Sequence, residues 1–214
     1  MLDCARGDAV INRREFLEAA AISALPVIAS ASAAAQAQAA PAPALHTIVI
    51  DSRHAEGRSL GAGVAAQGAM LRALPDGDVT RLWLEELAPA WRHHPIPIGG
   101  LTGRPALFCL EQLARTCGLR VVFHAEHIVH AAGRTEHRLL RGAQAAGLSA
   151  RSLIRAGPLW PARIAEVLGR PDRFAGRERQ GLSEAALSPA LPPGASLLTS
   201  WIIAGAVPWR YRPM

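Results

Sequence analysis

Residues 45–50 read Leu-His-Thr-Ile-Val-Ile and lead into Asp51, and this short apolar run decides the predicted fold. Its β-branched residues and its length predict a strand that is buried on both faces. Residues 55–74 follow, with apolar side chains such as Leu60 and Val64 at helical spacing, and they predict a helix despite their glycines. A buried strand followed by a helix is the first half of a parallel strand–helix–strand unit.

The same alternation continues along the chain after a turn at residues 75–78. Strands are predicted over residues 79–84, 119–124, 135–140 and 196–204, and helices over residues 105–116, 143–155 and 159–169. The strand over 135–140 is expected to form a hairpin with the strand before it, and residues 170–194 are expected to be loop. This order predicts an α/β fold with three layers, in which helices cover both faces of a mostly parallel, mixed sheet.

A different kind of segment precedes this domain. Arg13 and Arg14 are followed by Phe16 and Leu17, then by an alanine-rich apolar stretch over residues 19–35 and by small residues that suit a signal peptidase. This arrangement resembles the twin-arginine signal of exported bacterial proteins, in which an arginine pair stands shortly before Phe and Leu. The resemblance implies passage through the twin-arginine translocation machinery and a periplasmic location.

The resemblance also implies how the chain is divided. Residues 1–39 are expected to be the removable signal, residues 40–44 a Pro/Ala linker, and residues 45–214 a single α/β domain. The apolar stretch contains Pro26 and three serines, so we expect no stable membrane span after processing.

Composition bears on partners and on disulfides. The formal net charge is +6, but the arginines are scattered and often stand beside acids, and only one Tyr and four Phe are present for base stacking. We therefore expect no nucleic-acid partner. Cys109 and Cys117 lie in one predicted helix, about 12 Å apart at about 1.5 Å per residue. Because a disulfide needs less than about 7 Å between Cα atoms, we predict two free, mostly buried thiols.

Candidate ligand-binding residues follow from the predicted sheet, because ligands of open α/β sheets bind beyond the carboxyl ends of the strands. Asp51 and Arg53 follow the first strand, and His124 ends a later one. Gly100 and Thr102 belong to a glycine-rich run that we expect to open the helix over 105–116 and to bind an anion there. The alternative is an ordinary turn in which Thr102 caps the helix.

A metal site is a second possibility at the same edge. His124, Glu126 and His127 carry the ligand types that suit zinc, copper or iron. On a regular strand, however, positions 124 and 127 point to opposite faces, so the three side chains converge only if the chain leaves strand geometry. The identity of any cofactor, and of any catalytic residue, stays open because no nucleophile motif is present.

The mature domain also resembles small proteobacterial proteins that carry a twin-arginine signal, on residues 77–80, 100–103, 106–111 and 121–127. That resemblance implies no particular activity. We expect an exported periplasmic protein that binds a ligand or serves as an accessory protein to a periplasmic enzyme. The alternative is a small periplasmic hydrolase or metal-dependent enzyme with its site at the carboxyl ends of the strands.

Overall fold

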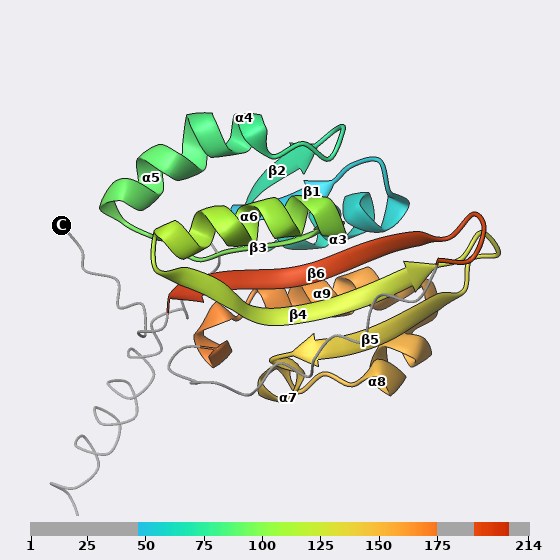
Figure 1. Cartoon of the computed structure of the whole chain (residues 1–214). Coiled ribbons are helices and arrows are strands. Elements are labelled where there is room, and N and C mark those ends of the chain that lie inside the picture. Colours follow the sequence, from blue (N-terminus) through green and yellow to red (C-terminus); the bar gives the residue numbers. More distant parts are fainter. Residues whose placement is uncertain (1–46, 175–190, 206–214) are drawn as a thin grey trace, which may run out of the picture. The chain divides into compact units, whose positions relative to one another are not determined.

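Six strands form one mixed sheet in the order β2-β1-β3-β6-β4-β5 (Figure 1). The computed structural model describes residues 47–174 and 191–205, so the predicted signal and the linker lie outside the described residues. Strands β1, β2, β3 and β4 run in one direction, whereas β5 and β6 run in the other. The strands are β1 (Thr47–Asp51), β2 (Met70–Leu74), β3 (Ile98–Gly103), β4 (Leu119–Val129), β5 (Thr135–Arg141) and β6 (Ser196–Gly205).

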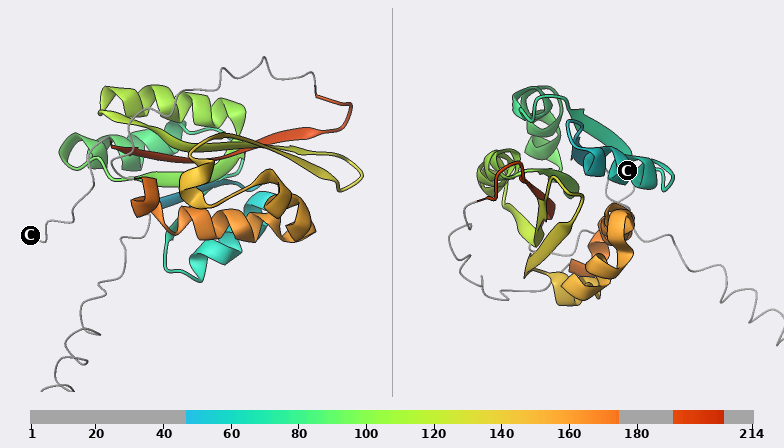
Figure 2. Two further views of the ribbon diagram at one scale, coloured as in Figure 1. Left: turned by 90° about the horizontal axis from the view of Figure 1, so that it is seen from below. Right: turned by 90° about the vertical axis from the view of Figure 1, so that its right-hand side faces the viewer.

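Helices cover both faces of this sheet, and Figure 2 shows the three layers edge-on. One face carries α3 (Ala55–Ala65), α7 (Ala143–Ala146), α8 (Ala150–Ala156), the 3-10 turn η2 (Gly157–Leu159), α9 (Trp160–Leu168) and the 3-10 turn η3 (Pro171–Phe174). The opposite face carries α4 (Thr80–Leu82), the π-helical turn η1 (Trp83–Leu87), α5 (Ala88–His93) and α6 (Arg104–Thr116). The predicted α/β fold, with a mixed sheet between two helical layers, is confirmed.

The three central residues of β1 are apolar because the strand lies inside the sheet and is covered on both sides. Ile48 and Ile50 point into the core beneath α3 and α9, whereas Val49 points into the core beneath α5 and α6. All three are at most 4% exposed. This alternation of direction along a strand is why a run without polar residues marks a strand covered on both faces.

The structure corrects the prediction between β1 and β3. Helix α3 ends at Ala65, and Gly68 adopts a left-handed turn with φ 79°, after which the chain enters β2 instead of continuing as a helix. The strand predicted over residues 79–84 is wrong, because α4 and the first residues of η1 occupy this segment, and α5 follows them. Leu82, Leu87 and Trp91 of these three helical elements are buried in the core on this face of the sheet.

Residues 98–103 form β3, although we expected a glycine-rich loop there. Gly99 and Gly100 pair with Ile48 and Val49 on one side and with Ile202 and Trp201 on the other. A Cβ atom at Gly100 would overlap the carbonyl oxygen of Val49 and lie 2.8 Å from the Trp201 ring. The glycine is therefore required by close packing inside the sheet, which is a common role of strand glycines.

Strand β4 is longer than predicted, and it contains a bulge. Its register against β6 shifts between Val121 and Phe123, so Val122 is an extra residue in the ladder. As a result Val121 belongs to the core beneath α6, whereas Phe123 and Ala125 belong to the opposite core. A bulge of this kind re-aims the side chains that follow it.

Candidate functional site

The connections from β1 and β3 leave the sheet on opposite faces, and this creates a crevice at its edge. Strand β1 continues into α3 on one face, and its neighbour β3 continues into α6 on the other. Such a switch point, at the carboxyl ends of parallel strands, is where α/β sheets usually bind ligands. Asp51 ends β1 and Gly103 ends β3, so both belong to this edge.

A buried ion pair forms the floor of this edge. The Asp51 carboxylate is fully buried and accepts hydrogen bonds from Arg53 Nε (2.9 Å to Oδ1), Arg53 Nη2 (2.6 Å to Oδ2) and the Arg53 backbone N–H (3.2 Å to Oδ1). Burial by itself raises the pKa of the Asp51 carboxyl, but the hydrogen bonds and the charge of Arg53 outweigh it and hold this pKa below its usual value. Asp51 is therefore ionised at neutral pH, and its charge is balanced by Arg53.

Two neighbours fix this pair in place. His54 Nε2 lies 3.9 Å from Asp51 Oδ2, and the Arg53 guanidinium lies over Gly77 in the turn after β2. Gly77 has φ 80°, and a Cβ atom there would overlap the guanidinium. The turn that the sequence predicts at residues 75–78 thus leaves room for the arginine side chain.

Contrary to the prediction, Thr102 and Gly100 do not line this crevice. Thr102 is fully buried, accepts a hydrogen bond from Trp201 Nε1 (3.0 Å) on its hydroxyl, and accepts another from Thr199 Oγ1 (3.1 Å) on its backbone oxygen. Gly100 lies deeper in the same strand. Helix α6 begins after Gly103. Because glycine has no side chain, Gly103 cannot cap the first N–H groups of this helix.

An open cavity of about 600 Å³ lies directly beyond this edge. It is formed by the β1–α3 connection, the first turn of α6 and the beginning of β6, and its wall is largely apolar. Its lining consists of Arg53, His54, Gly103, Arg104, Pro105, Phe108, Leu191, Ser196 and Leu197.

The predicted metal ligands are not brought together. Because of the bulge in β4, His127 faces the core beneath α9, whereas His124 and Glu126 face the α6 side. Glu126 is buried and pairs with Arg138 at 3.4 Å. Among the described residues no group of three or more His, Cys, Asp or Glu side chains is placed to hold a metal ion.

His124 differs from its neighbours because its Nε2 atom is buried and has no hydrogen-bond partner in the part of the chain that the structure describes. Burial lowers the pKa of His124, although the negative charges of Glu126 and Glu111 oppose this effect. The side chain is therefore neutral at pH 7. It lies in the middle of the sheet, opposite Trp201, and away from the crevice that Asp51 and Arg53 define.

A buried polar cluster that we did not predict lies on the other face. His127 Nδ1 lies 2.8 Å from His137 Nδ1, and His127 Nε2 lies 2.8 Å from the hydroxyl of Ser200. The His127 ring also stacks on Trp160, with centroids 4.2 Å apart. Burial lowers the pKa of His127 well below its usual value and that of His137 to about 4.

This cluster could have been found from the predicted hairpin. The strands of a hairpin with its turn near residues 131–134 pair position 127 with position 137, as the structure shows. Ser200 and Trp160 carry no comparable signal, because they come from a distant strand and a distant helix.

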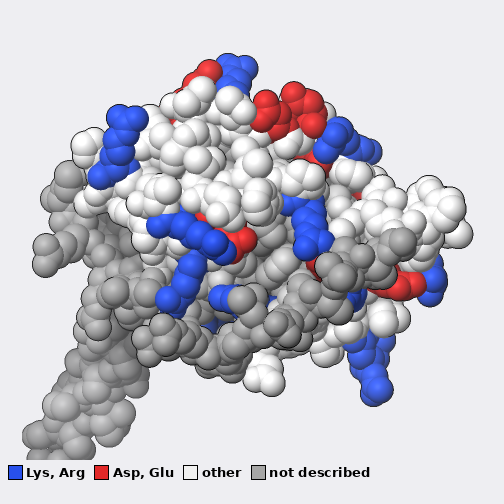
Figure 3. All heavy atoms as spheres, viewed as in Figure 1, with Lys and Arg blue, Asp and Glu red and all other residues white. Residues whose placement is uncertain are grey.

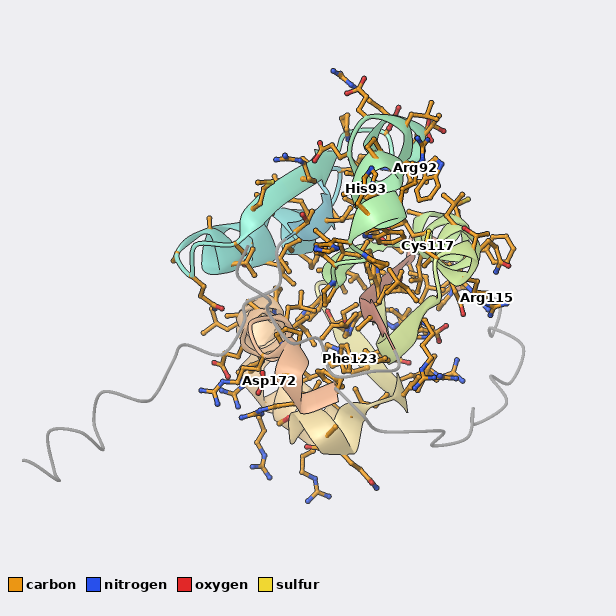
Figure 4. The ribbon with its side chains drawn as sticks, turned by 90° about the vertical axis from the view of Figure 1, so that its left-hand side faces the viewer. Arg92, His93, Arg115, Cys117, Phe123 and Asp172 are labelled. Carbon is orange, nitrogen blue, oxygen red and sulfur yellow. The ribbon has the colours of Figure 1, made fainter. Side chains whose placement is uncertain are left out.

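The cysteine prediction holds in part. Cys109 and Cys117 are both free, but Cys109 is exposed. Helix α6 buries Ala106, Leu107 and Leu110 against the sheet, and position 109 falls on the outer side. Cys117, labelled in Figure 4 at the C-terminal end of this helix, is half-buried.

On the face shown in Figure 3, the arginines of the described residues are dispersed, and several have acidic side chains beside them. In the ranges that the structure describes, no helix combines the length and the apolar character needed to cross a bilayer. Comparison of the chain with protein-family models, with curated proteins and with solved structures found no match.

Proposed function

We propose that this chain is an exported periplasmic ligand-binding protein, which acts by itself or as an accessory to a periplasmic enzyme. Its ligand is a small organic anion with an apolar body, and it binds in the cavity at the carboxyl edge between β1 and β3. The volume of about 600 Å³ lies within the range of small-molecule sites, about 300–1,000 Å³. The location at the switch point supports the same conclusion.

The observation that carries this proposal is the exposure of apolar side chains around the cavity. Six large apolar side chains are exposed among the described residues, and two of them, Phe108 (61%) and Leu191 (42%), line this one cavity. Pro105 and Leu197 extend the same apolar wall. A group of exposed apolar side chains around a concave surface is typical of a binding site.

The charges around the cavity favour a negative group on the ligand. Arg53 and Arg104 line it, and among the described residues no Asp or Glu side chain does; the Asp51 carboxylate that pairs with Arg53 is fully buried behind it. The first turn of α6 also lines the cavity, and its N-cap residue, Gly103, makes no side-chain cap hydrogen bond. Backbone N–H groups at a helix start bind anions well. The ligand therefore places its anionic group near this helix start and its apolar body against Phe108.

Replacing Phe108 by alanine is expected to weaken binding of octanoate by about fivefold, because a half-exposed phenyl ring loses roughly 1 kcal/mol of apolar burial with the ligand. Octanoate is a suitable probe because it combines a carboxylate with an alkyl chain, and octanamide is its uncharged counterpart. The measurement is calorimetric titration of the full chain with each compound. We expect octanamide to bind more weakly than octanoate.

The matched control is Leu159→Ala, which removes another exposed apolar side chain (68%) that does not line this cavity. This variant should bind octanoate like the wild type. Equal weakening in both variants, or the absence of saturable binding to the wild type, would contradict the proposed site.

Export is the second part of the proposal, and it is supported by the order of the arginine pair, the apolar stretch and the small residues after it. Replacing both Arg13 and Arg14 by lysine is expected to lower the periplasmic fraction of the protein by about tenfold, because the pathway reads the arginine pair itself. The measurement is fractionation of a bacterial host followed by immunoblotting.

The control for export is Arg6→Lys, which makes the same change outside the pair. It should leave the distribution unchanged. A full-length product that stays in the cytoplasm in the wild type, with residues 1–39 attached, would show that the predicted signal does not act as one.

A second candidate function is a small hydrolase at the same edge. It is favoured by His54, whose Nε2 atom lies 3.9 Å from the buried Asp51 carboxylate, and by Ser196, which lines the same cavity as His54. An acid that orients a histidine next to a hydroxyl is the arrangement of serine hydrolases. Hydrolysis of p-nitrophenyl octanoate that is lost in His54→Gln would favour this alternative over simple binding.

A further inference from the structure

A second cavity, of about 500 Å³, lies at the opposite edge of the sheet. Its wall includes Gln67, which follows α3 and precedes the start of β2, and residues at the C-terminal ends of α7 and α9. Among the described residues the two cavities share no lining residue, so this one is separate from the cavity proposed above.

The charged residues around this second cavity are mostly arginines. Arg163, Arg170 and Arg173 line it, together with one carboxylate, Glu166. Arg163 and Glu166 form an ion pair at 2.8 Å on the surface of α9. Neither Arg170 nor Arg173 has a carboxylate partner among the described residues, which leaves the cavity with excess positive charge.

The backbone holds these two arginines in fixed positions. Arg170 directly precedes the 3-10 turn η3, and Arg173 lies within it. The Arg173 N–H donates to the backbone oxygen of Arg170 (3.3 Å), and Pro171 and Phe174 of the turn are buried. Phe174 packs against Phe123 of β4, with ring centroids 5.6 Å apart. Figure 4 labels Asp172 on this turn and Phe123 in the sheet. The turn is thus anchored in the core.

Both arginines face the same cavity. Arg170 and Arg173 stand three positions apart in the sequence, and both line it. Arg173 Nη1 donates to the backbone oxygen of Ala146 (3.2 Å), which uses one of the five guanidinium N–H groups and leaves the others available. Asp172 lies between them in sequence, but it forms no ion pair with either among the described residues.

A polar side chain completes the wall. Gly169 lies against the Gln67 side-chain oxygen, and a Cβ atom at position 169 would overlap it. The absence of a side chain at Gly169 therefore leaves room for the Gln67 amide at the cavity. The amide adds N–H donors to those of the two guanidinium groups.

We infer that this cavity binds a small phosphate-bearing compound, which Arg170 and Arg173 hold together. A phosphate dianion matches two guanidinium groups because each forms paired N–H···O bonds with its oxygens. The same dianion balances the positive charge of the two arginines. The volume leaves room for an organic group attached to the phosphate.

The test is calorimetric titration of the full 214-residue chain with inorganic phosphate, with glycerol 3-phosphate and with succinate, in a chloride buffer. We expect saturable binding of both phosphates and weaker binding of succinate. Arg170→Gln should weaken phosphate binding by about tenfold, because it removes one charged bidentate donor. Arg173→Lys, which keeps the charge without the planar fork, should weaken it less than Arg173→Gln.

The matched control is Arg151→Gln, which removes an exposed arginine of α8 that does not line the cavity. It should bind phosphate like the wild type. Equal weakening in this control, no saturable phosphate binding, or tighter binding of succinate than of either phosphate would overturn the inference. Amide chemical shifts of Arg170 and Gly169 during the titration provide a second measurement, and shifts confined to other regions would count against the site.

Discussion

Replacing Arg53 by methionine is expected to lower the free energy of unfolding at pH 7 by more than the loss of an exposed ion pair does, because it leaves the fully buried Asp51 carboxylate without its partner. The loss should be smaller than for a pair buried on both sides, since the Arg53 side chain is half exposed. Methionine keeps most of the apolar stem over Gly77. Urea denaturation measured by fluorescence gives the difference directly.

Two comparisons identify the cause of this loss. The double variant Arg53→Met/Asp51→Asn removes the orphaned charge and should recover part of the stability. Arg81→Met breaks an exposed pair with Glu85 and should change stability by less than about 1 kcal/mol. A single variant as stable as the wild type, or a double variant that is less stable than the single one, would contradict this account.

The Arg53→Met variant should also respond to pH in a specific way. In the wild type the folded-state pKa of Asp51 is lowered, so its contribution is present above about pH 3.9 and is lost as the pH falls through the lower folded value. Without Arg53, burial is the largest remaining influence and is opposed only by the charge of His54, so the pKa of Asp51 rises. The deficit of the variant should therefore shrink as the pH is lowered toward 4.

The second large effect expected is a loss of stability in mild acid from the buried His127–His137 pair. The pKa of both rings is lowered in the folded state, that of His137 to about 4, whereas an unfolded histidine titrates near about 6.5. Between these values the unfolded chain binds more protons than the folded one. Stability should therefore be fully present above about pH 6.5 and should fall by up to about 1.4 kcal/mol per pH unit for each histidine as the pH drops toward 4.

The slope of unfolding free energy against pH, rather than its absolute value, is the measurement that matters. His137→Gln removes one of the two titrating rings. It should reduce this slope by about 1.4 kcal/mol per pH unit, which is the contribution of one proton. His93→Gln changes an exposed histidine and should leave the slope unchanged. An unaltered slope in His137→Gln would falsify this explanation. So would imidazole ¹⁵N shifts that show both buried rings titrating near about 6.5.

The layers of the fold were predictable because they depend on local patterns. The apolar run before Asp51 and the amphipathic helix after Gly103 were recognisable from spacing alone. The central strand β3 could not be predicted in this way, because glycines in a short stretch of sequence indicate a loop. Gly100 is explained only by the Trp201 ring and the Val49 backbone, which pack against it in the folded sheet. Met70–Leu74 was missed for a similar reason, since its apolar residues fit the helical spacing of the segment before it.

The candidate site was predictable only in its location. The general rule for α/β sheets identified Asp51 and Arg53, and the structure places both at the crevice. The sequence did not show that Phe108 and Leu191 line one cavity, because they are far apart in the chain. They come together because β6, which follows Leu191, pairs with β3, which precedes α6. Thr102 and His124 were assigned to the edge from sequence, but hydrogen bonding and β4 register place them inside the sheet.

The extra residue at Val122 determines which half of the domain each later histidine belongs to. Val122 is not paired with β6, so Val121 and Phe123 point to opposite faces although they are two positions apart in the sequence. If Val122 were instead paired as a regular strand residue, every later side chain of β4 would change face. His127 would then point toward α6 and lose its contact with the hydroxyl of Ser200.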